Sequence, residues 1–548
     1  MKRTILIIAI LAFSSLAFAQ KKTIQFDAEN LPTQLLTYLN SATSDDARKK
    51  DNAKVIKLFT DVYNATDDPT RERMTAVFSA AQKQKIRQIP DLTDFITLVW
   101  MLYTSEPDHH NFLPWIACVQ FIQENKTAKV FNEFTGFTRQ LITDRTLQKS
   151  RSAVWQAQPG SPYTLALQGR DIIVTFATPT DIFYNSDKDH GTIYGTKGTF
   201  NYLDSKWVGE GGRITWDRTG IPTTACWADL NRYQANTKLS KLSADSVQLT
   251  YTKYFTTPIM GSIEDVLDYP MEPEKYNYPK FRSYQNDFVL NDIIPGADYR
   301  GTFMLNGAKF VTSSTEHPAS LVFSRDGKPF IVVTSTKFTI ANGKALSERA
   351  AVKIYIDGDS IYNNGISMRY AVSDKRLTLV NNGKRNYYSP YTNTYHNLDM
   401  YCEQMVWNPE KDMIEMSMLG ETGSSSFATF ESSNYYSLKK YREIQGIDEQ
   451  SPVVKVFKFS KANGGLDEFS ISEFASAIKM DVSQAKLMIH NLAKGGLVSF
   501  DENLGIVYLK IRLNDYMRAY SKSRDYDVKP GVFEIRIIGI LLFKIFIQ

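Results

Sequence analysis

The stretch VKIYIDGDSIY, residues Val352–Tyr362, shows most directly how the largest part of this chain folds. Val352, Ile354 and Ile356 alternate with a lysine and a tyrosine, which is the period of a strand with one buried face. The dipeptide Asp357-Gly358 follows, and Asp-Gly between alternating segments is a strong signal for a tight hairpin turn. The stretch therefore predicts an antiparallel β-hairpin.

The same alternation extends over two blocks of the chain. We expect a first all-β domain over residues 151–268 and a second over residues 297–435, separated by a Pro- and Tyr-rich linker over residues 269–296. In the second block, Asn364-Gly365 and Asn382-Gly383 predict two more hairpin turns.

Two segments of this pattern carry a family resemblance. Ser243–Tyr251 and Ile354–Tyr362 look like rungs of the OstA-like β-jellyroll domains of lipopolysaccharide-transport proteins. The resemblance implies short strands stacked into an open trough that holds lipid. In that case Val352, Ile354 and Ile356 would line an apolar groove that is open to solvent. Any stacked antiparallel β-protein shares the alternation, so a closed two-sheet core is the alternative.

The region before the strands has a helical period. In residues 20–150 the apolar residues recur at helical spacing, and breaks at Asp67-Asp68-Pro69, Ile89-Pro90-Asp91 and Glu106-Pro107-Asp108 divide it. We count six amphipathic helices between Leu31 and Thr143. Successive helices with short turns favour either a stacked helical array or an irregular bundle. The fold class is thus α+β and multidomain.

A small mixed module is expected near the end of the chain. After a connector over residues 436–462, residues 463–515 resemble a winged-helix module: a helix preceded by Ser470-Ile-Ser-Glu473, a second helix, and a two-stranded wing. The second helix offers only Lys486, His490 and Lys494 as cations, which is too few for strong phosphate binding. We therefore expect protein docking or a structural role, and no nucleic-acid partner.

The two ends of the chain have distinct compositions. Residues 1–19 read as a secretory signal peptide, with Lys2 and Arg3 before an apolar run and a small-x-small cleavage site at Ala17–Ala19. Residues 516–548 read as a tail, either whole or truncated, whose final Ile/Leu/Phe run we expect to be an unpaired apolar end. The signal implies export to the periplasm or envelope of a Gram-negative bacterium, or to the outside of the cell.

Composition limits the partners. The formal charge is +5 and becomes +3 without Lys2 and Arg3, which is small for 548 residues and argues against nucleic acid. No stretch of about 18 apolar residues follows the signal, so no transmembrane helix is expected in the mature chain. Cys118, Cys226 and Cys402 are far apart and odd in number, and they read as buried apolar residues rather than disulfides or metal ligands.

The candidate chemical sites are few, and no common catalytic motif is present. Asp108-His109-His110 clusters at a turn but lacks a third metal ligand. Asn185-x-Asp187-x-Asp189 has calcium-loop spacing without the glycine and glutamate of an EF-hand, so a polar hairpin tip is favoured. The most enzyme-like group joins two aromatic rings to two carboxylates, as glycan binding or cleavage requires: Trp207, Glu210, Trp216 and Asp217.

We therefore expect an exported, non-catalytic envelope protein that serves as a scaffold or interaction protein with other envelope proteins as partners. A lipid- or glycan-binding or transport protein that uses the β domains is the alternative, and a glycan-cleaving enzyme is a lesser one. No cofactor and no metal are expected.

Overall fold

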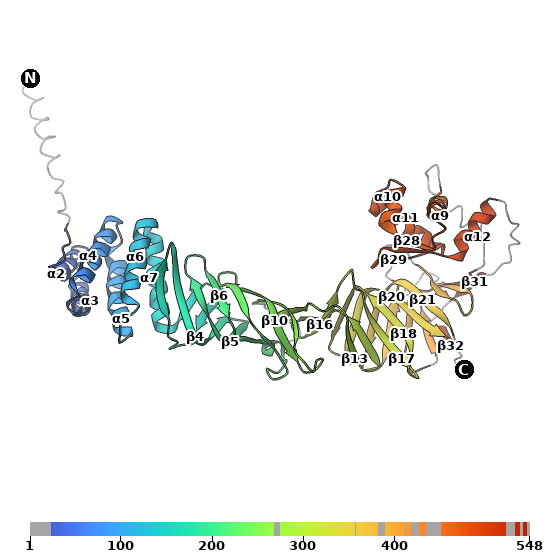
Figure 1. Cartoon of the computed structure of the whole chain (residues 1–548), viewed down its shortest axis with the longest axis horizontal. Helices are drawn as coiled ribbons and strands as arrows, with labels where there is room; N and C mark the ends of the chain where they lie inside the picture. Colours follow the sequence, from blue (N-terminus) through green and yellow to red (C-terminus); the bar gives the residue numbers. More distant parts are fainter. Residues whose placement is uncertain are drawn as a thin grey trace, which may run out of the picture. The chain divides into compact units, whose positions relative to one another are not determined.

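The computed structural model describes residues 24–267, 275–356, 358–381, 389–411, 413–417, 427–433, 451–521, 532–536 and 541–544. It is a mixed α+β protein whose described residues fall into two compact units (Figure 1). The first unit comprises residues 24–214 and 229–244, and the second contains residues 215–228 and those from 245 onward. The predicted signal peptide, residues 1–19, lies outside the described residues.

The first unit begins with the six helices expected from the apolar spacing: α2 Leu31–Asn40, α3 Asp46–Ala65, α4 Asp68–Lys83, α5 Thr93–Ser105, α6 Phe112–Asn125 and α7 Ala128–Asp144. Helices two apart in sequence pack together, α3 on α5, α4 on α6 and α5 on α7, as in a stacked array. A run of aromatic contacts forms the core, with Phe95 at its centre, 5.6 Å from Phe78 and 5.4 Å from Trp115 between ring centroids.

The first β block follows, mostly in the same unit, and its seventh, eighth and tenth strands each have residues in both units. Its strands are β1 Thr146–Lys149, β2 Val154–Ala157, β3 Thr164–Gln168, β4 Asp171–Asn185, β5 His190–Asn201, β6 Lys206–Glu210, β7 Arg213–Thr215, β8 Cys226–Asp229, β9 Arg232–Asn236 and β10 Lys241–Tyr251. All the described pairings are antiparallel.

The long strands β4 and β5 are shared between two ladders. The first half of β4 pairs with β3, its second half pairs with β2, and the register of the β4–β5 pair shifts between Phe176 and Ile182. Such irregularities bend strands and let them change partners. The buried faces of the two ladders meet, because Trp155 of β2 donates a hydrogen bond to Ser240 beside β9 at 3.2 Å.

The second unit repeats this arrangement with more strands: β11 Ile259–Val266, β12 Lys280–Ser283, β13 Phe288–Ile294, β14 Ala297–Gly301, β15 Met304–Asn306, β16 Lys309–Ser313, β17 Ala319–Arg325, β18 Lys328–Ser335, β19 Lys337–Ala341, β20 Lys344–Ile356, β21 Asp359–Ala371, β22 Arg376–Val380, β23 Tyr391–Asn393, β24 Leu398–Tyr401, β25 Gln404–Trp407, β26 Met413–Ser417 and β27 Phe427–Ser432. Here β20 and β21 are the shared long pair, since β20 contacts β19 with one half and β18 with the other.

The core of this block lies between its two ladders. Aromatic pairs connect the two ladders: Phe330 of β18 contacts Trp407 of β25, and Phe323 of β17 contacts Tyr370 of β21, each with 5.0 Å between ring centroids. Within β20, Val352, Ile354 and Ile356 are at most 5% exposed. The expected open apolar groove along these three residues is therefore wrong, because the facing ladder covers them.

Turn and boundary predictions had mixed outcomes in this block. β20 and β21 form the predicted antiparallel pair, with Ile356 opposite Asp359, while Asp357 of the predicted turn lies outside the described residues. Asn364-Gly365 is not a turn: it lies inside β21, where the pairing with β20 is irregular, and glycine in a strand often marks such a site. Asn382-Gly383 lies outside the described residues. The predicted linker, 269–296, contains β12 and β13, so its later part belongs to the sheet.

The C-terminal module in the second unit consists of α9 Pro452–Ala462, β28 Glu468–Ser470, α10 Ile471–Ala477, α11 Val482–Lys494, β29 Val498–Asp501, β30 Ile506–Leu509 and α12 Ile511–Tyr520, with strand order β28-β30-β29. Val456 of α9 and Tyr516 of α12 are buried in its core with the residues of α10 and α11. The module therefore extends beyond the predicted 463–515 at both ends, into the predicted connector and tail.

The predicted tail also contains two strands, β31 Val532–Arg536 and β32 Leu541–Lys544. They pair antiparallel with β27 and β26. The expectation of an unpaired apolar end is therefore wrong for these residues. The three cysteines are free and buried, as predicted. No helix among the described residues combines the length and the apolar character needed to cross a membrane.

Candidate functional site

The two tryptophans of the predicted glycan site are core residues. Trp207 and Trp216 are both 0% exposed. The indole of Trp207 donates a hydrogen bond to the Tyr233 hydroxyl at 2.9 Å, and that of Trp216 donates to the Pro279 carbonyl at 3.2 Å. Sugar binding by stacking requires an accessible ring face. The assignment of these two rings as a stacking platform is therefore wrong.

The two carboxylates of the same set are exposed and lie in different units. Glu210 ends β6 in the first unit. Asp217 belongs to the second unit, begins a short 3-10 turn and accepts a hydrogen bond from the Thr215 hydroxyl at 2.5 Å. Without the two rings, this set keeps no feature that is specific to glycan chemistry.

The calcium-like spacing lies at a hairpin tip, as favoured. Asn185, Asp187 and Asp189 lie at or in the β4–β5 turn. The Asp189 carboxylate accepts a hydrogen bond from the His190 backbone amide at 2.8 Å, and the Ser186 hydroxyl accepts one from the Asp189 amide at 2.9 Å. Local turn bonds of this kind account for the polar residues there.

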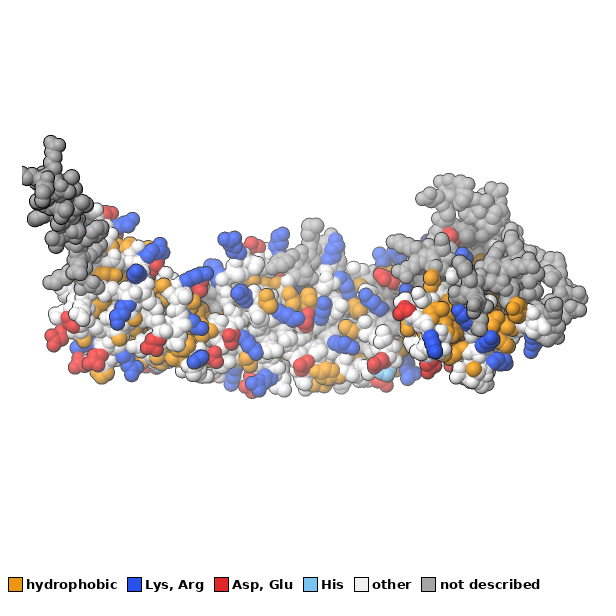
Figure 2. Space-filling model, turned by 90° about the horizontal axis from the view of Figure 1, so that it is seen from above, with side chains coloured by type: hydrophobic (Ala, Val, Ile, Leu, Met, Phe, Trp, Pro, Cys, Tyr) orange, Lys and Arg blue, Asp and Glu red, His pale blue; other side chains and the backbone are white. Residues whose placement is uncertain are grey.

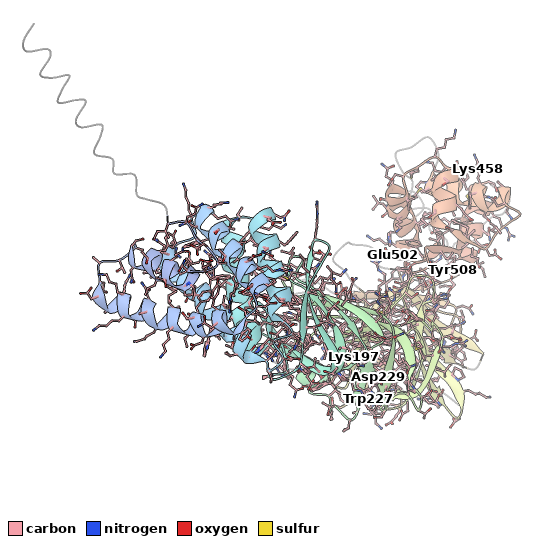
Figure 3. The ribbon with its side chains drawn as sticks, turned by 60° about the vertical axis from the view of Figure 1, so that its left-hand side comes forward. Lys197, Trp227, Asp229, Lys458, Glu502 and Tyr508 are labelled. Carbon is pink, nitrogen blue, oxygen red and sulfur yellow. The ribbon has the colours of Figure 1, made fainter. Side chains whose placement is uncertain are left out.

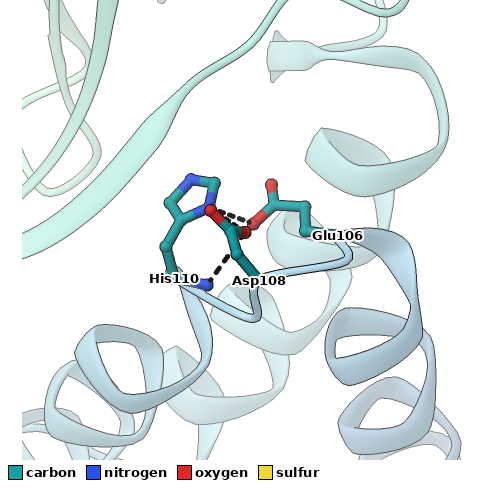
Figure 4. A group of neighbouring side chains, drawn as sticks. All are labelled: Glu106, Asp108 and His110. Atoms are coloured by element: carbon teal, nitrogen blue, oxygen red, sulfur yellow. Dashed lines mark hydrogen bonds and ion pairs between the residues drawn. The ribbon is translucent and has the colours of Figure 1, made fainter.

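The histidine turn between α5 and α6 forms a real side-chain cluster, made by Glu106, Asp108 and His110 rather than by His109 (Figure 4). Nδ1 of His110 lies 2.7 Å from an Asp108 oxygen and 3.2 Å from a Glu106 oxygen. Nε2 lies 3.1 Å from the backbone carbonyl oxygen of Tyr163. The sequence left the third member unnamed because Glu106 lies on the far side of Pro107.

The charges of this cluster support one another. The hydrogen bond that His110 donates to Asp108, and after it the one to the Tyr163 carbonyl, raises the pKa of His110, and the same contact with His110 lowers the pKa of Asp108. Each ring nitrogen lies near an oxygen acceptor, which favours the protonated imidazolium, and the Asn111 amide nitrogen also lies 3.0 Å from Nε2. One ligand atom from each residue lies within 4.8 Å of the others, a spacing that a cation could bridge, but these hydrogen bonds explain the geometry without one.

The neighbouring Asn111 fastens this turn to the first β block. Its side chain is 1% exposed. The amide nitrogen donates to Glu106 at 2.9 Å and to the Tyr163 carbonyl at 3.1 Å, while the amide oxygen accepts from the Leu165 backbone at 2.6 Å. We call Glu106, Asp108, His110 and Asn111 the clasp. It holds the α5–α6 turn against the start of β3 and has no visible catalytic geometry.

In the C-terminal module, one of the three cations expected on the second helix is already paired. His490 of α11 forms an ion pair with Glu502, which is labelled in Figure 3 and also pairs with Arg349 of β20. The bond from His490 lowers the pKa of Glu502. Elsewhere on the surface, Figure 2 shows cationic and anionic side chains interspersed on the visible face. Neither feature resembles a phosphate-binding surface.

A buried ion cluster joins this module to the second β block. Asp399 of β24 lies 3.1 Å from Arg512 and 3.3 Å from Lys510, and Arg512 lies 3.4 Å from Glu431 of β27. The side chains of Asp399 and Arg512 are 2% and 4% exposed. Burial lowers the pKa of Lys510, and Asp399 opposes that shift only in part. We call these four residues the ion cluster.

A glycine makes this close approach possible. Gly496, just after α11, has a φ of +71°, and a Cβ built there would lie 2.6 Å from Arg512 and 3.0 Å from Asp399. A side chain at this position would be strained and would collide with the ion cluster. The sequence showed Gly496 as a helix end, but gave no sign of the cluster, whose members are spread over more than a hundred residues.

No family model matches this chain, and no curated protein or solved structure matches it significantly. The function must therefore be argued from the residues themselves.

Proposed function

We propose that this chain is an exported, non-catalytic protein of the cell envelope that acts as a scaffold for other envelope proteins. The observation that carries the proposal is the ion cluster, which attaches the C-terminal module to the second β block through charges that are almost wholly buried. Attachment of this kind holds the module in a fixed position on the β block. A fixed surface suits the docking of other proteins better than it suits a module that moves to bind a ligand.

The module has the element order helix, strand, helix, helix, strand, strand, helix over residues 451–521, and its part from β28 to β30 supports a winged-helix fold. In that fold the second helix of the pair reads DNA by entering the major groove. Here His490 on that helix is occupied by Glu502, which supports a docking role instead. The stacked strand pairs of the two β blocks are compatible with the OstA-like resemblance, in a closed rather than an open form.

Export rests on the signal-like residues 1–19 alone. Expression of the full precursor in a Gram-negative host should give mature protein that begins at Gln20 in the envelope or periplasmic fraction. N-terminal sequencing of the fractions tests this, and recovery of the uncleaved chain in the cytosol would contradict export.

Cross-linking tests the scaffold role. Lys458 is exposed on α9 (Figure 3) and can report contacts of the module to an amine-reactive cross-linker. We expect one envelope protein to be cross-linked at Lys458 in stoichiometric amount in cells. The variant Gly496→Ala should give a lower yield of this cross-linked product, because the added Cβ disturbs the contact between the module and the ion cluster. Gly495→Ala is the matched control, because Gly495 has an ordinary helical φ of −74°. Recovery of no stoichiometric partner would refute the scaffold.

Ligand binding is a second candidate function, and it is favoured by a large polar groove in the first unit.

A further inference from the structure

The groove lies in the first unit, between helix α7 and one end of the first β block. Its volume is about 910 Å³. It is bounded by α7, by β1, and by the turns of three hairpins, β3–β4, β5–β6 and β9–β10. Pockets for small ligands span about 300–1,000 Å³, so this groove is at the upper end of that range.

Hydrogen bonds between the turns hold the groove in shape. Thr237 of the β9–β10 turn donates to the Ser205 carbonyl of the β5–β6 turn through both its amide and its hydroxyl, each at 2.9 Å. The Ser205 hydroxyl in turn donates to Gln148 of β1 at 3.1 Å. These bonds connect the turns to one another and to β1, so the surface of the groove is formed before a ligand binds. Little binding free energy would therefore be spent on ordering the turns.

The charges around the groove are unbalanced. Four exposed cations contribute to it, and none forms an ion pair with a described residue: Lys126, Lys149, Arg170 and Lys238. Three acids also line it. Of these, Glu133 lies 3.7 Å from Lys129, and Asp204 accepts a hydrogen bond from Asn201 at 3.1 Å, while Asp171 starts β4. The excess of unpaired cations favours an anionic ligand.

The wall of the groove combines an aromatic ring with an open helix position. Tyr202 is partly exposed, its ring lies 4.5 Å from that of Phe137, and its hydroxyl makes no hydrogen bond to any described residue. Gly136 of α7 has no atom within 4 Å of a Cβ built on it. Helix α7 covers part of the Tyr202 ring, and the exposed part of the ring, its hydroxyl and the uncrowded wall at Gly136 leave room for a ring-shaped polar ligand.

We propose that this groove binds an acidic oligosaccharide, which goes beyond the scaffold function. The tyrosine supplies a ring and a hydroxyl for the sugars, and the four cations supply charge for the carboxylates or other anionic groups along the ligand. A lipid chain fits less well, because much of the lining is charged or polar. An acidic peptide shares the charge but not the sugar rings.

The test uses the purified full chain and isothermal titration with hexagalacturonate, an uncharged cellohexaose and hexaglutamate. We expect hexagalacturonate to bind, and the other two to bind at least about tenfold more weakly, a difference of about 1.4 kcal/mol in binding free energy. Equal binding of cellohexaose would refute the anionic ligand. Equal binding of hexaglutamate would refute the sugar and favour a peptide. Absence of hexagalacturonate binding would refute the proposal.

A matched pair of variants locates the site. Gly136→Trp should place a large side chain in the groove, because a Cβ built there meets no atom within 4 Å, and should weaken hexagalacturonate binding by about tenfold or more, whereas Gly136→Ala should leave it within about twofold. Both should fold, because the position is open and alanine favours helices. Arg170→Gln with Lys238→Gln should reduce the salt dependence of binding. Unchanged affinity in Gly136→Trp, or an unchanged salt dependence in the double variant, would refute this site.

Discussion

The molecule brings helices against a β block in two places, and the two contacts are made differently. In the first unit, α7 meets the first β block through aromatic rings, with Tyr202 5.2 Å from Phe134 and 4.5 Å from Phe137, and a wide groove remains beside them. In the second unit, the C-terminal module meets its β block through the ion cluster, from which solvent is almost excluded.

The difference follows from what each interaction tolerates. Aromatic contacts gain free energy in proportion to the area they bury, so they can stop at the rim of a groove. Buried charges are stable only when each has its partner and its hydrogen bonds, so their surroundings must be closed completely. The first contact therefore leaves room for a ligand, and the second is suited to fixing one part of the unit to another.

The largest effect is expected from breaking the ion cluster. Asp399→Ala leaves Arg512 and Lys510 buried without their shared partner, and removing one member of a buried pair costs about 3–5 kcal/mol. Urea unfolding should show this loss, and limited proteolysis should cut the module first. A change below about 1 kcal/mol, the range of exposed pairs, would mean that the cluster does not hold the module.

A smaller loss is expected at the clasp. Asn111→Ala removes the side-chain acceptor of the Leu165 amide and one of the two partners of the Tyr163 carbonyl, which keeps His110, and an unsatisfied buried polar group costs about 1–3 kcal/mol. Thermal unfolding of the chain measures the loss. Asn132→Ala is the matched control, because Asn132 is exposed on α7 and its hydrogen bond to Asp91 is at the surface. Equal melting temperatures for the two variants would exclude the clasp as a stabilising contact.

The clasp should also depend on pH, with a sign that can be derived. The folded-state pKa of His110 is raised above its ordinary value of 6.5, so its contribution to stability is fully present below that value and is lost as the pH rises through the folded-state pKa. The native chain should therefore lose stability relative to His110→Gln on going from mildly acidic to alkaline conditions. The partial exposure of the ring keeps the effect small. Parallel stability curves for the two proteins would contradict it.

The smallest effect is expected for an exposed ion pair. Lys375 and Glu410 form one in the second unit, with side chains 50% and 63% exposed. Lys375→Ala should change the unfolding free energy by about 0–1 kcal/mol, in contrast to Asp399→Ala, because water already screens the pair. A loss as large as that of Asp399→Ala would show that burial does not distinguish the two sites.

Local sequence signals predicted the elements well where the responsible residues are neighbours. Asp67 caps α4 at the break that Asp67-Asp68-Pro69 predicted, and the dipeptide Asp357-Gly358 predicted the antiparallel pairing of β20 with β21. Ser470 caps α10 by accepting from the Ser472 amide, so its place at the helix start was also correct.

The sites could not be predicted in the same way, because they depend on residues that are distant in sequence. Trp207 and Trp216 suggested a sugar platform, but alternation alone does not tell which face of a strand a second ladder will cover. The ion cluster joins Asp399 to Arg512, and the groove joins one helix to three hairpin turns. Charged residues at such positions look like solvated surface until the pairing of the strands is known.

The buried cysteines give the chain three built-in reporters of local opening. Cys118 lies in α6, Cys226 begins β8 and Cys402 lies between β24 and β25. Burial raises the pKa of Cys118 and of Cys402 to about 12, and that of Cys226 also well above its ordinary range. The thiolate is the reactive form, so an oxidant or alkylating reagent can modify each sulfur only while its own surroundings are open. The rate at which each thiol is labelled thus measures how often the helical array, β8 and the β24–β25 turn open separately, without any substitution in the chain.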